Sequence, residues 1–170
     1  MLYILNYLLE IFLMFDKKVM LTKEGLKKVE EELLHLKRVK RKEIAEKIRN
    51  AVSFGEIAEN AEYIAAKNEQ AFIEGRIFTL ERIIENYELI DENKKNSGFV
   101  SLGSEVFVED LKLKKKIEFI ILDYVEAEPD FGKISISSPI GKALLGKKKG
   151  DVVEIRVPAG QLKFKVLDIK

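Results

Sequence analysis

The sequence of 170 residues lacks cysteine and contains a single histidine, His35. Without cysteine, the chain forms no disulfide bond, offers no thiolate nucleophile and builds no cysteine-ligated zinc site. One histidine is too few for a histidine-rich metal centre, and the residues around His35 do not suggest a catalytic serine and histidine pair. Any metal chemistry in which the chain takes part therefore depends on carboxylates.

A strong charge of one sign is also missing. Thirty lysines and arginines stand against 29 acidic residues, which gives a formal net charge of +1. The whole molecule therefore has no strong attraction to nucleic acid, and any such contact must be local. Charged residues nevertheless make up 35% of the chain and hydrophobic residues 46%. This composition predicts a small domain with a core and an extended, solvent-exposed helical element.

Residues 1–15 are apolar apart from Asn6 and Glu10. As a helix they would extend about 22 Å, which is less than the ~30 Å hydrocarbon thickness of a bilayer. They also lack a basic start and a small-residue cleavage site, so we expect neither a membrane span nor a secretory signal. Residues 1–19 are an extension with three open interpretations. In the first, the native protein starts at Met14 or Met20 and does not contain the extension. In the second, the extension is a disordered tail. In the third, it is an apolar helix that docks on the body or on a partner.

The stretch from Thr22 to about Ala51 is predicted to form one helix. Thr22 is a good N-cap, and no proline interrupts the stretch. The apolar stripe of this helix is interrupted at Lys40, which resembles a stutter in a coiled-coil seam. The stripe consists of Leu26, Val29, Leu33, Leu36, Ile44, Ile48 and Ala51.

A second helix is predicted from about Glu59 to Leu89, where seam residues alternate by three and four positions. These residues are Tyr63, Ala66, Gln70, Ile73, Ile77, Leu80, Ile84 and Tyr87. Two such stripes bury each other when the chain folds back on itself. Residues 20–92 are therefore expected to form an antiparallel coiled-coil hairpin about 45 Å long, with its tip at residues 55–62.

The polar residues 93–98 are a predicted linker, and β-rich alternating segments follow it. We expect strands at 105–109, 116–124, 133–137, 152–157 and 162–169, a turn at 158–160 and a short helix at 140–145. The fold class is thus α+β with two domains, and residues 99–170 form a small domain with an antiparallel sheet. Its predicted core consists of Val106, Val108, Ile117, Phe119, Ile121, Ile134, Ile136, Leu144, Val153, Ile155, Phe164, Val166 and Ile169.

Around the predicted tip the sequence reads Phe54-Gly55-Glu56-Ile57-Ala58-Glu59-Asn60-Ala61-Glu62-Tyr63. This stretch resembles the tip motif of the Gre family of bacterial transcript-cleavage factors, especially its GreA-like members. The resemblance continues from Met20–Gly25 through Glu74–Ile77 to Ser138–Gly146, so it covers both predicted domains.

The resemblance implies a function at RNA polymerase. Members of the family have an N-terminal coiled coil and a C-terminal FKBP-like domain that docks on the polymerase. The tip enters the secondary channel and stimulates the polymerase's own magnesium-dependent cleavage of backtracked RNA, which rescues arrested complexes. We therefore expect a cytoplasmic monomer that contacts RNA polymerase and the nascent RNA 3′ end. It is not itself an enzyme, binds no membrane and has no cofactor of its own.

By resemblance, Glu56 helps to hold a magnesium ion shared with the polymerase, and Glu59 orients the attacking water. Magnesium accepts a few carboxylates while it retains water, and two-metal hydrolysis requires both of these tasks. A tip with two or three acids therefore suits donation to another protein's site. Acids in a first helical turn also favour the macrodipole, which is the structural alternative. The family usually has aspartate in place of Glu56, which leaves the strength of cleavage open.

A basic group lies on the first predicted helix. By resemblance, it guides the extruded RNA through phosphate contacts; the alternative is a solvated helix face paired with Glu43 and Glu46. The group consists of Lys37, Arg38, Lys40, Arg41 and Lys42.

In the second domain, Asp123, Ser138 and Pro139 match the region through which relatives hold a polymerase coiled coil. Two other functions stay open. A Gre-like inhibitor would block the polymerase channel without cleavage, and a coiled-coil chaperone or scaffold would hold clients along its arm. The acids at the tip favour the cleavage factor, because inhibitory relatives alter them and a scaffold does not need them.

Overall fold

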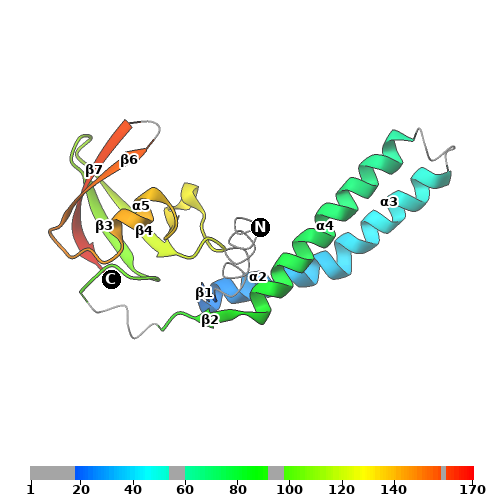
Figure 1. The fold of residues 1–170 in the computed structure, drawn as a ribbon, viewed down its shortest axis with the longest axis horizontal. Helices are drawn as coiled ribbons and strands as arrows, with labels where there is room; N and C mark the ends of the chain where they lie inside the picture. Colours follow the sequence, from blue (N-terminus) through cyan, green and yellow to red (C-terminus); the bar gives the residue numbers. More distant parts are fainter. Residues whose placement is uncertain (1–17, 54–59, 92–97, 158–159) are drawn as a thin grey trace, which may run out of the picture. The chain divides into compact units, whose positions relative to one another are not determined.

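The structure is a computed structural model that describes residues 18–53, 60–91, 98–157 and 160–170. Its contacts divide the chain into two compact units, which Figure 1 shows in colours that follow the sequence. The first contains Leu26–Asn86, and the second contains Lys18–Gly25 together with Tyr87–Lys170. Most of the predicted N-terminal extension, the tip acids and most of the predicted linker lie outside the described residues.

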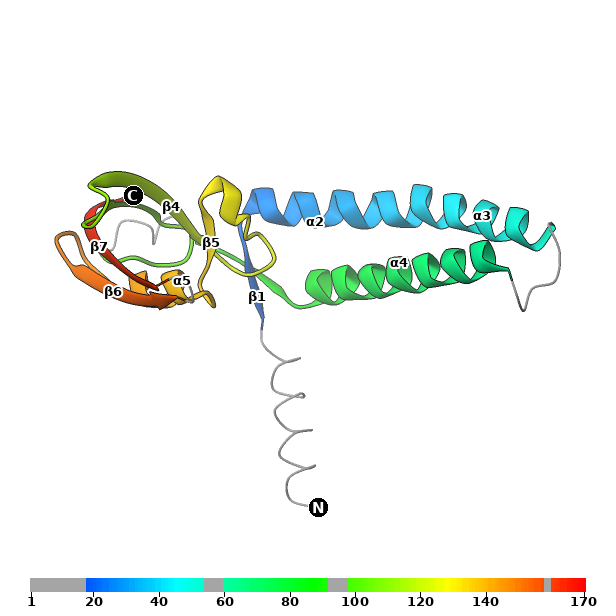
Figure 2. The ribbon, with the colours of Figure 1, turned by 90° about the horizontal axis from the view of Figure 1, so that it is seen from above.

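The first unit is a helical hairpin, hereafter the hairpin. Its outgoing helical segment comprises α2 (Lys23–His35) from Leu26 onward, η1 (Leu36–Lys40) and α3 (Arg41–Ser53). Helix α4 (Ala61–Glu85) runs back beside it (Figures 1 and 2). Ion pairs between the helices join Glu32 to Arg76 and Lys47 to Glu69. The sequence separation of these pairs shrinks from 44 to 22 residues towards the turn, as an antiparallel hairpin requires. The predicted helical hairpin is confirmed.

The interruption predicted at Lys40 corresponds to η1, a π-helical segment. In a regular α-helix, the step from Leu36 to Ile44 would rotate the apolar stripe by about 80°. The wider π turn absorbs most of this rotation, so that Leu36 and Ile44 both pack in the hairpin's apolar cluster. That cluster consists of Ile44, Ala66, Ile73 and Ile77, flanked by Leu33, Leu36 and Ile48.

The second helix is shorter than the sequence predicted. It ends at Glu85, and Tyr87–Leu89 form strand β2, which pairs in parallel with β1 (Val19–Leu21). Placing Tyr87 in the helical seam was therefore wrong, and Ile83, only 4% exposed, is buried where Ile84 was expected. Helical spacing continues through this stretch by coincidence, and pairing with a segment far away in the sequence decides its conformation.

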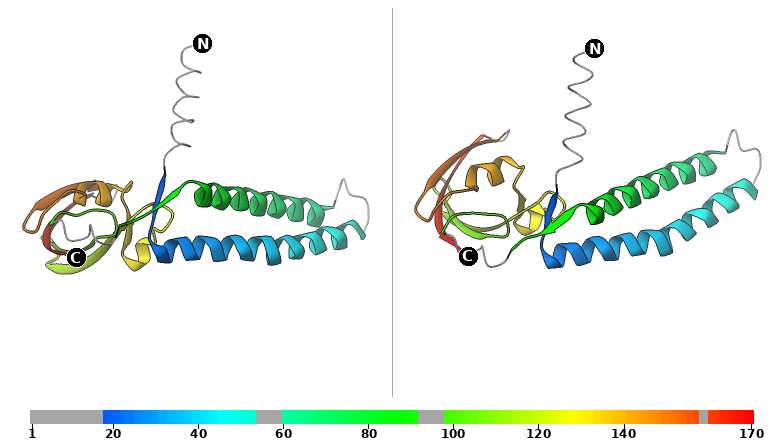
Figure 3. Two further views of the ribbon diagram at one scale, coloured as in Figure 1. Left: turned by 90° about the horizontal axis from the view of Figure 1, so that it is seen from below. Right: turned by 60° about the horizontal axis from the view of Figure 1, so that its bottom comes forward.

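The second unit is hereafter called the sheet domain. Its main sheet has the strand order β5-β4-β3-β7-β6. Its neighbours pair antiparallel except β4 and β5, which are parallel, so the predicted purely antiparallel sheet was wrong at this edge. Figure 3 shows that the sheet is curled. The strands are β3 (Glu105–Asp110), β4 (Lys115–Leu122), β5 (Lys133–Ser135), β6 (Val152–Val157) and β7 (Gly160–Ile169); the short helices are η4 (Pro129–Phe131) and α5 (Pro139–Leu144).

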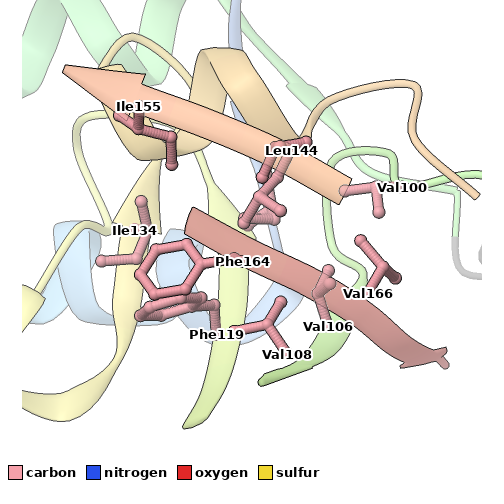
Figure 4. Close-up of a cluster of buried hydrophobic side chains, with 11 residues drawn as sticks. Val100, Val106, Val108, Phe119, Ile134, Leu144, Ile155, Phe164 and Val166 are labelled. Atoms are coloured by element: carbon pink, nitrogen blue, oxygen red, sulfur yellow. The ribbon is translucent and has the colours of Figure 1, made fainter. Parts of the chain in front are cut away.

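Alternation along the strands builds the core of the sheet domain. Side chains of β3 alternate strictly between half-buried and buried, as expected of a strand with one face on a core. Phe119 and Phe164 meet edge to face, with ring centroids 5.8 Å apart and the planes at 62° (Figure 4). Every predicted core residue lies in this cluster or packs against it, and Val100, 2% exposed, was missed because it precedes the strands. None of the helices in the described part of the chain is long and apolar enough to cross a membrane.

Candidate functional site

The predicted catalytic acids, Glu56 and Glu59, lie outside the described residues, but the chain on both sides of them is described. Helix α3 ends at Ser53, and Asn60 is the N-cap of α4. The Asn60 Oδ1 atom accepts a hydrogen bond of 3.1 Å from the Tyr63 backbone N–H. The Asn60 amide Nδ2 donates one of 2.6 Å to the Ala51 carbonyl in the last turn of α3. One side chain therefore joins the two helices at the end of the hairpin that carries the predicted tip.

Three of the five basic residues predicted to contact RNA are paired with carboxylates. The Lys37 Nζ atom lies 2.6 Å from Glu81, and the Lys40 Nζ atom lies 2.7 Å from Glu43. Arg41 binds Glu74 through two hydrogen bonds, from Nε to Oε1 at 2.8 Å and from Nη2 to Oε2. The hydrogen bond from Arg41 lowers the pKa of Glu74, and the one from Lys40 lowers the pKa of Glu43. For these three residues, the structure agrees with the alternative interpretation, a solvated helix face whose cations are paired with carboxylates.

The other two, Arg38 and Lys42, are exposed and have no carboxylate partner among the described residues. Arg49, likewise exposed and unpaired within that part of the chain, lies seven positions after Lys42. Residues spaced by four and seven positions share one face of a helix. Arg38, Lys42 and Arg49 therefore form a basic stripe, which leads along the first helix towards the tip.

Two carboxylates of the sheet domain hold the segment at Lys18–Gly25. Asp123, 8% exposed, accepts a hydrogen bond of 3.1 Å from the Met20 backbone N–H and one of 2.6 Å from the Tyr124 backbone N–H. Glu126 accepts from both the Thr22 backbone N–H, at 2.8 Å, and the Thr22 hydroxyl. We call Asp123 and Glu126 the acidic latch. Both oxygens of Asp123 are bound within the sheet domain, and its predicted docking role stays a prediction.

The latch also orders the start of the first helix. The Thr22 hydroxyl oxygen accepts a hydrogen bond of 2.9 Å from the Gly25 backbone N–H, which confirms Thr22 as the N-cap. Burial, together with the charge of Asp123, raises the pKa of the neighbouring Tyr124. Sequence reasoning missed Glu126, because only a contact across 104 residues gives this carboxylate its role.

The predicted docking residues Ser138 and Pro139 begin helix α5. The Ser138 hydroxyl accepts a hydrogen bond of 3.0 Å from the Gly141 backbone N–H, and Pro139 occupies the first helical turn. A Cβ atom at Gly141 would lie 2.1 Å from the Ser135 carbonyl oxygen, so only glycine permits this approach. The loop is therefore held in one conformation, with the Pro139 side chain exposed.

Within the part of the chain that the structure describes, no group of three or more acidic, histidine or cysteine side chains could hold a metal ion. The predicted magnesium ligand, Glu56, is not among those residues.

Comparisons with known proteins agree with the motif at the tip. The family model "Transcription elongation factor, N-terminal" matches residues 19–89, and "Transcription elongation factor, GreA/GreB, C-term" matches residues 94–170. Transcription elongation factor GreA of Acetivibrio thermocellus is 53% identical over 155 residues, which cover 91% of this chain and 98% of that protein. GreA of Thermoanaerobacter pseudethanolicus is 56% identical over 155 residues, which cover 91% and 99%.

Among solved structures, the GreA factor homolog 1 protein of Thermus thermophilus is 33% identical, with a TM-score of 0.42, and the match covers 91% of this chain and 99% of that one. Together the two family models cover both units, and each of the two GreA relatives matches 91% of the chain. The chain therefore belongs to the GreA/GreB family of transcription elongation factors.

Proposed function

We propose that this elongation factor binds RNA polymerase, places the tip of its hairpin in the secondary channel and stimulates the polymerase to cleave backtracked RNA. The observation that carries the proposal is the motif Gly55–Tyr63, which follows α3 and continues into the first turn of α4, in a chain whose family membership spans both units. An acidic pair between two long antiparallel helices is suited to a site that the rest of the protein does not enter.

The proposed chemistry is donation of two carboxylates to the active site of another protein. Glu56 contributes to a magnesium ion shared with the polymerase, and Glu59 orients the water that attacks the phosphodiester. Two carboxylates leave most of the coordination positions of magnesium unfilled. The hydrolysis therefore belongs to the polymerase, and the factor alone cleaves nothing.

The basic stripe is proposed to contact the nascent RNA 3′ segment. Arg38, Lys42 and Arg49 are exposed without a carboxylate partner in the described chain, whereas Lys37, Lys40 and Arg41 already have one. An unpaired cation can bind a phosphate without giving up an existing ion pair. RNA contact is thus concentrated on the stripe and weaker at the three paired residues.

Docking on the polymerase is assigned to the sheet domain, for which we propose the FKBP-like fold of the family. The exposed Pro139 and the capped Ser138 offer a fixed surface, whereas the buried Asp123 acts by holding the segment at Lys18–Gly25. The factor works as a monomer in the cytoplasm, where its polymerase is found.

The test of the cleavage function uses a stalled, backtracked elongation complex with end-labelled RNA. The full chain is expected to release short 3′ fragments in the presence of magnesium, and Glu59→Ala is expected to reduce the rate on the order of 10²-fold or more. Glu62→Ala, which removes an exposed acid from the same region, is the matched control and should retain activity. If the wild-type chain slows the polymerase and releases no fragment, it is the channel-blocking inhibitor. If it does not bind polymerase, the chaperone or scaffold function gains support.

Docking is tested with the full chain by Pro139→Glu. A glutamate is tolerated in the first turn of a helix, so α5 should remain folded while the proposed surface gains a charge. The concentration needed for half-maximal cleavage should rise, with the rate at saturation unchanged. The control is Lys112→Glu, an exposed change of charge in the turn between β3 and β4. Equal effects of the two substitutions would argue against docking through α5.

A further inference from the structure

The side chain of Asn60 makes two hydrogen bonds that no other cap residue could make together. Its Oδ1 atom accepts from the Tyr63 N–H at 3.1 Å, and its Nδ2 atom donates to the Ala51 carbonyl at 2.6 Å. The first partner can only donate and the second can only accept, so the partners themselves fix the orientation of the amide. We call this pair of bonds the Asn60 bridge.

The bridge joins two helix ends that would otherwise leave polar groups unpaired. The first N–H groups of α4 and the last carbonyls of α3 have no partner within their own helices. Serine, threonine and aspartate also cap helix N-termini. The carboxylate of aspartate has no hydrogen-bond donor, and the side chain of serine or threonine is shorter and carries a single polar group. Asparagine therefore caps α4 and reaches α3 with the same side chain.

Small buried residues allow the two helices to approach at this point. Ala51 is 3% exposed and Ala66 is 5% exposed, and neither has a side chain long enough to hold the helices apart. The Asn60 backbone is extended, with φ −82° and ψ 97°, so the chain leaves the helical path directly before α4. The bridge thus fixes the position of the backbone at residue 60 against the end of α3.

We propose that Asn60 is a positioning residue for RNA cleavage, which acts by holding the backbone next to Glu59. This inference rests on the proposed function, because it assumes that the Glu59 carboxylate orients the attacking water. Residue 60 follows Glu59 directly in the sequence, so a fixed backbone at 60 limits the positions that the carboxylate can occupy. A displacement of about 1 Å in a catalytic group can reduce a rate by roughly 10²-fold.

The test separates the bridge from the cap. Asn60→Ser keeps a good N-cap and loses the donor to Ala51, while Asn60→Asp keeps the acceptor and loses the donor. Both variants should reduce the cleavage rate at saturating factor by about tenfold or more and leave the half-saturating factor concentration unchanged. Asn68→Ser makes the same exchange at an exposed position of α4 and should behave as the wild type.

A double variant decides whether Asn60 acts through Glu59. Glu59→Ala combined with Asn60→Ser should be no slower than Glu59→Ala alone, because a displaced carboxylate no longer matters once it is removed. If Asn60→Ser cleaves at the wild-type rate while Glu59→Ala is inactive, the positioning role is wrong and the proposed function stands. If Glu59→Ala is itself fully active, the proposed function fails first. If the Asn60 variants instead weaken polymerase binding and the effects multiply, the bridge only stabilises the hairpin and the inference is overturned.

Discussion

The hairpin and the sheet domain are stabilised in different ways. In the sheet domain, apolar side chains from five strands and α5 surround one core, in which Val106, Val108, Leu144 and Val166 have no exposed surface. In the hairpin, the buried cluster is a single row between two helices. Among the described residues of the hairpin, no third element covers these two helices, so their outer faces are exposed.

Ion pairs border the row of the hairpin. They join Lys37 to Glu81, Arg41 to Glu74, Lys47 to Glu69 and Arg76 to Glu32. Such exposed pairs contribute little each and are screened by salt. The hairpin is thus a long element of modest local stability that presents a tip, and the sheet domain is a packed body suited to docking. Changes in the apolar core should have the larger effects and changes in the charged border the smaller ones.

The largest effect is expected from Phe164→Ala in the core of the sheet domain. Phe164 is 3% exposed and meets Phe119 edge to face. Its loss should cost about 3–5 kcal/mol of unfolding free energy, because the surrounding sheet closes the cavity only in part. Phe131→Ala removes the same side chain from a position that is 76% exposed and should change stability by less than about 0.5 kcal/mol. Urea unfolding measures both. Similar losses in the two variants would contradict the assignment of the core.

The second effect is expected from Ile77→Ala in the hairpin. Ile77 is 2% exposed in the row between the helices, and its truncation should cost roughly 2–4 kcal/mol. Hydrogen exchange followed by mass spectrometry should speed up in peptides of α3 and α4 and stay unchanged in β3–β7, because the two buried clusters are separate. The control is Phe78→Ala, a neighbour that is 60% exposed. Faster exchange in the strands as well would show that the two units share one cooperative unit.

Patterns among neighbouring residues were enough to predict the sheet domain and the hairpin. Features that depend on contacts between residues far apart in the sequence were not predicted. Alternation identified β3 and β6, because this pattern depends on neighbours in sequence. The interruption of the apolar stripe at Lys40, interpreted as a coiled-coil stutter, falls within η1, but the stripe did not predict a π-helical segment. The family resemblance and the elongation-factor function carried by the motif Gly55–Tyr63 were also confirmed. Tyr87 was assigned wrongly, since its spacing fits a helical seam and only its pairing with Val19 makes it a strand residue.

The predicted sites show the same limit. The sequence places Lys37, Arg38 and Arg41 in one basic group. It does not show that Lys37 pairs with Glu81 and Arg41 with Glu74, because these partners lie on the other helix. It also gives no sign that Asp123 binds Met20 across 103 residues. The roles of Glu56 and Glu59 stay predictions. The Asn60 bridge is visible only once Ala51 and Tyr63 are brought to the same end of the hairpin.

A smaller effect is expected from Gly25→Ala, where the first helix begins. Gly75→Ala serves as the control, because it measures the effect of helix propensity alone. A Cβ at Gly25 would lie 2.0 Å from the Glu126 carboxyl carbon, whereas nothing lies within 4 Å of Gly75 in α4. Gly25→Ala should displace Glu126 from Thr22 and cost about 1–2 kcal/mol, as expected when bonds to a charged group are lost. Gly75→Ala should instead stabilise the protein by up to about 1 kcal/mol. Thermal unfolding of both variants measures the difference. A gain in stability in both would mean that the latch contributes nothing.

The smallest effect is expected at the charged border, from Glu74→Gln. The hydrogen bond from Arg41 lowers the pKa of Glu74 in the folded chain, below the value near 4.3 of an unfolded glutamate. The stabilisation is therefore present above the unfolded pKa and is lost as pH falls through the folded one. Melting of the helical signal should show a small advantage of the wild type over Glu74→Gln near neutral pH. That advantage should shrink below about pH 4 and at high salt. A constant difference at all pH values would assign the contribution of Glu74 to packing instead of charge.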